Sequence, residues 1–205
     1  MIDRVITSGT FSLDGQDFDV DNNIWIVGDE AEVLVLAAAH DHRPILEGIG
    51  GRAVVAIVCT HGHNDHVNAA VALAEATGAP ILLHPDDRAL WDVVHPDRAP
   101  DGELADGQVL AAGGIGLEVL HTPGHTWGGC CFHAATEGVL FSADTLFNGG
   151  PGATGRSYSD RPTILRSIEE RLLVLPESTV VHTGHGDSTT IGAEAPHLPE
   201  WKAAG

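Results

Sequence analysis

The segment THGHNDH at residues 60–66 constrains this chain more than any other stretch of its sequence. It directly follows residues 53–59, a continuous apolar run rich in valine that is typical of a strand buried on both faces. A helical pattern of apolar residues begins after it and ends before Gly78, a residue suited to terminate a helix. Because a strand end and a helix start both fix the backbone, the polar side chains between them are held in a small volume.

Four side chains of this segment are of types that bind cations: His61, His63, Asp65 and His66. Alternation along the chain places the first two histidines on one side, and the turn into the helix lets the other two side chains point to a second spot nearby. Without a cation, each buried imidazole or carboxylate would need its own hydrogen-bond partners, so burial would be costly. The segment therefore predicts a metal site.

The remaining segments predict two groups of strands with helices. The first group has strands at residues 5–13, 24–27, 33–36, 53–59 and 81–83, with helices at 44–49, after residue 66 and at 86–94. The second has strands at 108–110, 117–120, 130–133, 139–141 and 179–182, and a helix that starts near Asp160 and stops at Pro176. We expect two sheets with helices outside them, in a single domain over residues 1–205.

The charge balance excludes several classes of partner. Acidic residues outnumber basic ones by 29 to 10, which gives a formal net charge of −19, and such a surface repels both nucleic acid and anionic membranes. The longest strongly apolar stretch, residues 33–39, is far shorter than the ~18 residues that span a bilayer, and the N-terminus shows no signal pattern. Three cysteines cannot form a disulfide framework. We therefore expect a cytoplasmic protein with no nucleic-acid or membrane partner.

Three later segments share one form, in which a predicted strand runs into a loop that carries a ligand-type residue. They are LHTPGH at residues 120–125, FSADT at 141–145 and VHTGHG at 181–186. Taken in order, HxHxDH, TPGHT, DTLF and GHG resemble the metallo-β-lactamase superfamily and, within it, the glyoxalase II-like thioester hydrolases. The resemblance runs from about residue 5 to residue 190. It implies an α/β fold that is a four-layer αβ/βα sandwich, with the site at one edge between the sheets.

The resemblance also implies a set of metal ligands. One metal would be held by His61, His63 and His125, and a second by Asp65, His66 and His185, with Asp144 bridging the two. An all-nitrogen group suits zinc, whereas a group with a carboxylate also tolerates iron or manganese. We expect two divalent ions, with zinc favoured. Seven ligands around two ions leave coordination positions open, which is typical of a catalytic site.

The function that the resemblance implies is hydrolysis of a small acyl-thiol ester, in which metal-bound hydroxide attacks the thioester carbonyl. Asp65 has a possible second, catalytic role in holding that hydroxide by a hydrogen bond. Two alternatives use nearly the same ligands: a mononuclear iron persulfide dioxygenase, and a lactone or β-lactam hydrolase. The sequence does not identify the acyl group, the thiol carrier or the oligomeric state.

This chain departs from the family pattern at three places. Ala37 stands where the family usually has a carboxylate at a strand end, and Ala143 replaces the usual glycine before Asp144. Glutathione-using glyoxalase II enzymes continue into a helical extension, whereas this sequence ends at Gly205. We therefore expect a thioester substrate in general rather than a glutathione thioester in particular.

Residues 150–155 read GPGATG and match GxGxxG, but no strand-to-helix turn surrounds them, so they predict a loop rather than a dinucleotide site. In related hydrolases this segment borders the mouth of the site. Arg156 and Tyr158 are therefore candidate contacts for an acidic group of the substrate. The remaining histidines away from the motifs, His40 among them, are expected in surface or capping roles, and Cys130 and Cys131 as small core residues.

Overall fold

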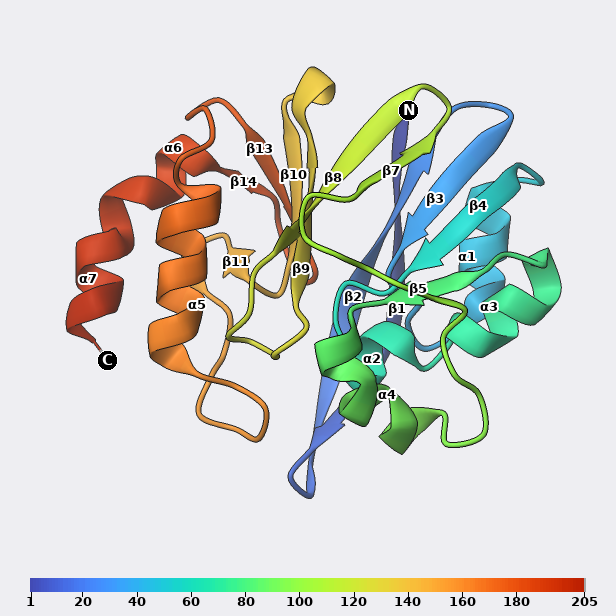
Figure 1. Ribbon diagram of the computed structural model, residues 1–205, viewed down its shortest axis with the longest axis horizontal. Helices are drawn as coiled ribbons and strands as arrows, with labels where there is room; N and C mark the ends of the chain where they lie inside the picture. The colour runs from blue at the N-terminus through green and yellow to red at the C-terminus, as the bar shows by residue number, and fades with distance from the viewer. Residues whose placement is uncertain (205) are drawn as a thin grey trace.

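Two six-stranded sheets lie face to face in the computed structural model, which describes residues 1–204 (Figure 1). The first sheet runs in the order β1 (Ile2–Leu13), β2 (Gln16–Gly28), β3 (Glu32–Leu36), β4 (Ala53–Val58), β5 (Ile81–Leu83) and β6 (Gly102–Glu103). The second runs in the order β14 (Thr189–Thr190), β13 (Val180–Thr183), β10 (Val139–Ala143), β9 (Cys130–Ala134), β8 (Ile115–His121) and β7 (Val109–Ala112). A short pair, β11 (Leu146–Phe147) and β12 (Gly150–Pro151), lies beside them.

Helices cover the outer face of each sheet. The first sheet carries α1 (His42–Ile49), α2 (Asn64–Val67), α3 (Ala70–Thr77) and α4 (Arg88–Val94), and the second carries α5 (Arg161–Ser167), α6 (Ile191–Glu194) and α7 (Leu198–Ala203) (Figure 1). The predicted four-layer αβ/βα sandwich is confirmed. No helix within residues 1–204 is long and apolar enough to cross a membrane.

Apolar residues fill three layers between these elements. Along β2, Trp25 and Val27 face the second sheet, whereas Ile24 and Ile26 face the helices, because successive strand residues point to opposite faces. The layer between the sheets also contains Phe132 and Phe141 of the second sheet. The two outer layers pack each sheet against its helices, as in the cluster formed with Ile164, Ile168 and Leu172. Both sheets are therefore buried on two faces near their centres.

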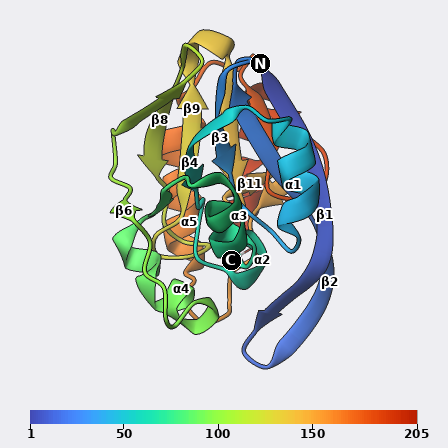
Figure 2. The ribbon, with the colours of Figure 1, turned by 90° about the vertical axis from the view of Figure 1, so that its right-hand side faces the viewer.

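The first two strands are longer than the sequence predicts. They pair antiparallel over their whole length, from Ile2 opposite Val27 to Leu13 opposite Gln16, through a turn at Asp14 and Gly15 with φ of 52° and 73°. Residues 16–19 of β2 are exposed, and Figure 2 shows this hairpin extending beyond the rest of the molecule. The polar stretch QDFDVDNN has no apolar run that marks a buried strand, and for that reason only residues 24–27 were predicted there.

Two predicted helices are interrupted. The segment after residue 63 forms α2 and then α3, separated by a turn at residues 68–69. The helix that begins at Asp160, whose side chain accepts a hydrogen bond from the Thr163 N–H, continues from α5 into a π-helical turn, Ile168–Leu172.

All three cysteines are free and buried, which for Cys130 and Cys131 confirms the prediction of small core residues. Burial raises the pKa of the Cys59 thiol to about 12 and that of Cys131 to about 11. Each is therefore a neutral thiol at physiological pH rather than a reactive thiolate.

Candidate metal centre

The loop after β4 and the short helix α2 bring four of the predicted ligands together. His61 and His63 follow the buried end of β4, and His63 is the extended residue that precedes α2. Asp65 and His66 lie within α2 itself and are almost completely buried. The strand end and the helix thus hold these side chains as the sequence analysis expected.

The other three predicted ligands come from the second sheet. His125 lies in the loop between β8 and β9, Asp144 directly follows β10, and His185 follows β13. Because β10 and β13 are parallel neighbours, the loops after them emerge at the same edge of the sheet. The backbone N–H of Gly184 also donates to the Ala143 carbonyl, which holds these two loops together.

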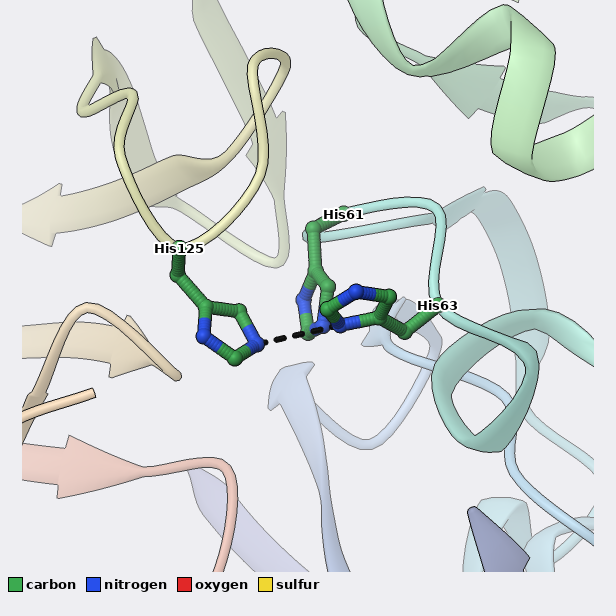
Figure 3. A group of neighbouring side chains, drawn as sticks. All are labelled: His61, His63 and His125. Carbon is green, nitrogen blue, oxygen red and sulfur yellow. Dashed lines mark hydrogen bonds between the residues drawn. The ribbon is translucent and has the colours of Figure 1, made fainter. Parts of the chain in front are cut away.

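The first group of ligands consists of His61, His63 and His125 (Figure 3). His63 Nδ1 and His125 Nε2 lie 3.0 Å apart, with the two rings at 88° to each other. His61 is packed beside them, with its ring 4.9 Å from that of His63 and 5.0 Å from that of His125. Three imidazole nitrogens therefore converge on one point.

The second group consists of Asp65, His66 and His185. The Nε2 atoms of His66 and His185 are 3.2 Å apart. Oδ2 of Asp65 lies 3.4 Å from His66 Nε2 and 3.5 Å from His185 Nε2. This group therefore combines a carboxylate with two imidazoles.

Asp144 lies between the two groups. Its Oδ2 is 3.6 Å from His125 Nε2 in the first group and 3.2 Å from His185 Nε2 in the second. Its Oδ1 is 3.4 Å from His66 Nε2. One carboxylate thus contacts residues of both groups, which is the geometry that a bridging ligand requires.

The spacing of these atoms fits divalent metal ions. Tetrahedral ligands at about 2.0–2.1 Å from a zinc ion lie about 3.3 Å from one another, and the separations here range from 3.0 Å to 3.6 Å. Buried polar atoms normally have partners. Among residues 1–204, the buried side-chain atoms that have none include His61 Nε2, whose other ring nitrogen contacts Thr60 Oγ1, and Asp144 Oδ1. The unpartnered nitrogens of His63 and His66 are Nε2 and Nδ1, the ring nitrogens opposite to those that make the contacts above.

The protonation states also suit cation binding. Burial lowers the pKa of His63 to about 3 and that of His61 well below its usual range, so both imidazoles are neutral and have a free lone pair. Burial alone would raise the pKa of Asp65, but His66 and His185 lower it to about 2. Burial alone would lower the pKa of His185, but Asp144 and Asp65 raise it to about 11. Without a metal, the His185 imidazole is therefore protonated, and its positive charge faces the carboxylates of Asp65 and Asp144.

Backbone carbonyl groups fix the orientation of two of the histidines. The Nδ1–H of His125 donates to the Ala153 carbonyl at 2.9 Å, and the Nδ1–H of His185 donates to the Asp21 carbonyl at 2.7 Å. In each case the outer nitrogen carries the hydrogen, so Nε2 turns toward the centre.

Asn22 and His40 support Asp65, although no sequence motif marks either of them as part of the site. The buried amide of Asn22 donates to the Asp65 carbonyl at 2.8 Å and to Asp65 Oδ2 at 3.1 Å. His40 Nε2–H in turn donates to Asn22 Oδ1 at 2.8 Å. The surface or capping role expected of His40 is therefore wrong, because its half-buried ring belongs to the network behind Asp65.

Asp87 is a third residue that the sequence did not indicate. It is 1% exposed and follows β5, outside every motif. Its carboxylate accepts hydrogen bonds from Thr126 Oγ1 at 2.7 Å and from the Gly128 N–H at 2.6 Å, both in the loop that carries His125. The same carboxylate also contacts the loop between His61 and His63.

A cavity of about 210 Å³ opens onto both groups of ligands. Arg156 and Tyr158 are not among the residues that line it. The Arg156 guanidinium lies 4.7 Å from the centre of the Phe18 ring and donates to Gln16 Oε1 at 2.9 Å, so it contacts the β1–β2 hairpin. Tyr158 is 39% exposed. The lining residues are Phe11, Val20, His63, Asp65, His125, Asp144, Phe147, Ala153 and His185.

The two alanines that depart from the family pattern both adopt left-handed backbone conformations. Ala37 has a φ of 63° and Ala143 a φ of 45°, a region that favours glycine, asparagine or aspartate. The glycine or carboxylate that usually stands at these positions would adopt the conformation more easily. Both residues therefore carry backbone strain, and Ala143 does so directly before the candidate ligand Asp144.

Comparison with known proteins identifies the family. The chain matches the metallo-beta-lactamase superfamily over residues 17–185. An uncharacterized protein of Aquifex aeolicus is 35% identical over 212 residues, covering 97% of this chain and 96% of that protein. A hydroxyacylglutathione hydrolase, GloC, of Haemophilus influenzae is 36% identical over 152 residues, covering 67% of this chain and 71% of the enzyme.

A solved structure agrees with these relatives. The crystal structure of TTHA1623 in a di-iron-bound form matches this fold with a TM-score of 0.77 and 32% identity, covering 86% of this chain and 93% of that one. Together with the sandwich fold and the seven converging side chains, these similarities lead to one conclusion. The chain belongs to the metallo-beta-lactamase superfamily, whose members are mainly metal-dependent hydrolases.

Proposed function

We propose that this protein is a dinuclear metal-dependent hydrolase of a small acyl-thiol ester. The observation that carries the proposal is the position of Asp144, whose carboxylate contacts His125 of the first group as well as His66 and His185 of the second. A carboxylate placed in this way suits two neighbouring ions rather than one. The similarity to a hydroxyacylglutathione hydrolase supports a thioester as the substrate.

The seven candidate ligands have the following proposed roles. His61, His63 and His125 would hold one ion, Asp65, His66 and His185 the other, and Asp144 would bridge them. Divalent ions bound there lower the pKa of a water molecule toward neutrality and polarise a carbonyl group. Asp65, whose Oδ2 accepts a hydrogen bond from the Asn22 amide, would also hold the attacking water by a hydrogen bond.

We propose zinc as the resident metal, because an all-nitrogen group such as His61, His63 and His125 suits zinc. Iron is the alternative to be separated by experiment, since TTHA1623 has been solved in a di-iron-bound form. Elemental analysis of the purified protein distinguishes the two metals. One iron per chain together with oxygen uptake on a persulfide would instead support the dioxygenase.

Metal content and thioester turnover of matched variants test the proposal. His185→Ala removes a ligand, whereas His197→Ala changes a histidine whose side chain is 52% exposed and lies outside both groups. We expect the first variant to lose one metal and nearly all thioesterase activity, and the second to keep both. Full activity in His185→Ala, or hydrolysis of lactones or β-lactams but no thioester by the wild-type protein, contradicts the proposal.

A conservative variant separates the two roles of Asp65. Asp65→Asn keeps the shape and one possible ligand oxygen but removes the negative charge. If Asp65 also positions the attacking water, turnover should fall more than metal content does. Equal losses of turnover and metal would restrict Asp65 to metal binding.

A further inference from the structure

We infer that the substrate of this site has a compact apolar acyl group and a thiol carrier without anionic groups. The inference rests on the proposed thioesterase function and adds the chemical class of the substrate. It follows from the walls of the cavity, its volume and the charges of the bordering loop and hairpin.

Two aromatic rings form the flanks of the cavity. Phe11 on β1 packs against His63 of the first group, with the ring centres 5.1 Å apart, and Phe147 on β11 lies 6.1 Å from the ring of His185 in the second. Val20 and Ala153 complete the lining. Apart from the ligands themselves, no residue lining this cavity within residues 1–204 has a hydroxyl, amide or charged side chain.

This composition discriminates between acyl groups. A hydroxyl group on the acyl chain finds no side-chain partner on these walls except the ligands, so its burial carries a desolvation cost. An apolar acyl group of the same length has no hydroxyl to desolvate and gains contact with Phe11 and Phe147. The site should therefore prefer a simple acyl thioester to its 2-hydroxyacyl analogue.

The volume restricts the size of the group. The cavity volume of about 210 Å³ lies below the range of about 300–1,000 Å³ that is typical of small-molecule pockets. That space accommodates a thioester carbonyl with a short chain of carbons on one side. Most of the thiol carrier must then lie outside the cavity, over the β1–β2 hairpin and the loop around residue 153.

The surface outside the cavity does not favour an anionic carrier. Arg156, the basic residue of the bordering loop, packs on Phe18, donates to Gln16 and does not line the cavity. The outer part of β2 has exposed acidic residues, Asp17, Asp19 and Asp21 among them. With a net charge of −19, this surface repels a carrier that bears carboxylates or phosphates.

Four thioesters in a two-by-two design test the inference. The acyl group is butyryl or 2-hydroxybutyryl, and the carrier is N-acetylcysteamine, which is uncharged, or glutathione, which is anionic. We expect kcat/KM to be about tenfold higher for butyryl than for 2-hydroxybutyryl on the same carrier. We also expect the uncharged carrier to be preferred, with the preference shrinking between about 0.05 M and about 0.5 M NaCl.

Two variants report on the walls directly. Val20→Thr places a hydroxyl on the cavity wall at nearly constant volume and should lower the ratio of kcat/KM for butyryl to that for 2-hydroxybutyryl thioesters. Val174→Thr, at a position 69% exposed, is the control and should leave this ratio unchanged. Ala153→Arg adds a cation to the lining and should raise kcat/KM for the glutathione thioesters several-fold. Ketone analogues, in which CH₂ replaces the thioester sulfur, are not hydrolysed. Their binding affinities should follow the same order as the kcat/KM values of the four thioesters.

The possible results separate the two proposals. Hydrolysis of the thioesters with equal rates, or with a preference for 2-hydroxybutyryl-glutathione, overturns the inference about substrate class and leaves the thioesterase proposal intact. If the metal-loaded protein hydrolyses none of the four, the proposed function fails and the inference fails with it.

Discussion

The carboxylate of Asp87 accepts a hydrogen bond of 2.7 Å from the backbone N–H of Gly62, the residue between His61 and His63. Because the same carboxylate also accepts hydrogen bonds from the loop that carries His125, a single buried side chain joins the two loops of the first ligand group. These loops belong to different sheets, so Asp87 also connects the two halves of the sandwich beneath the site.

Asp87→Ala should therefore weaken metal binding at the first group. With the carboxylate gone, the loops lose the hydrogen bonds of Gly62, Thr126 and Gly128 to Asp87, while the backbone hydrogen bond from the Cys130 N–H to the Thr60 carbonyl remains. We expect the affinity of His61, His63 and His125 for zinc to fall about tenfold to a hundredfold. Competition with a chromophoric chelator measures this change. Asp92→Ala, at a side chain in α4 that is 45% exposed and belongs to none of the ligand groups, is the control and should bind as the wild type does. Equal affinities for all three proteins would contradict the role of Asp87.

Asn22→Ala should affect the second group selectively. The substitution removes both hydrogen bonds from the Asn22 amide to Asp65, so this carboxylate loses its fixed orientation. We expect cobalt titration to show weaker binding at the Asp65 group and unchanged binding at the His61 group. His40→Ala, which removes the support behind Asn22, should give a smaller change of the same sign. His42→Ala, next to it in the first turn of α1, should leave cobalt binding unchanged. Weaker cobalt binding at both groups in Asn22→Ala would indicate general unfolding instead.

The sequence indicates the two sheets and the seven side chains that the structure brings together because the signals are local. Four ligand-type residues lie within six positions, and His125, Asp144 and His185 each follow a strand with an apolar pattern. A strand end determines where the next few residues lie, so neighbouring loops can be placed without knowledge of the whole fold.

The supporting residues could not be predicted in the same way. Asn22 lies in a polar stretch of the hairpin, and its contact with Asp65 depends on how the first sheet is packed against α2. Asp87 belongs to a short turn after β5 whose sequence resembles an ordinary helix start. Both contacts join residues far apart in the chain, and neither residue has a spacing that would indicate its partner.

Metal binding at the second group should release a proton. His185 has a pKa of about 11 and is protonated at neutral pH, whereas an imidazole must be deprotonated to bind a metal. His61 and His63 are already neutral, since burial lowers their pKa values, to about 3 in the case of His63. Affinity at the second group should thus rise about tenfold per pH unit near neutrality, with about one proton released. A pH-indicator dye in weakly buffered solution measures the release, and His185→Ala should abolish it.

Gly184→Ala should disturb the bridging carboxylate. A Cβ atom at residue 184 would overlap Oδ1 of Asp144, so that Asp144 must move away from its position between the groups. We expect loss of metal at both groups and of thioesterase activity, with the far-ultraviolet circular dichroism spectrum retained. Gly116→Ala is the control, because a Cβ there meets only an ordinary contact at 3.6 Å. Normal metal content in Gly184→Ala would show that Asp144 is not needed where the structure places it.

The backbone strain at Ala143 predicts that the substitution Ala143→Gly changes the free energy of unfolding less than such substitutions normally do. Replacing a buried alanine by glycine normally destabilises a protein by about 0.5–1 kcal/mol through backbone entropy, with a further loss of up to about 0.8 kcal/mol for the buried methyl group. At Ala143, with a φ of 45°, glycine also relieves a left-handed conformation that costs about 1–2 kcal/mol. Ala143→Gly should therefore be close to neutral in urea unfolding, whereas Ala134→Gly, at a fully buried strand residue with a φ of −94°, should destabilise by about 1–2 kcal/mol. Equal destabilisation of the two variants would mean that the backbone at Ala143 is not strained.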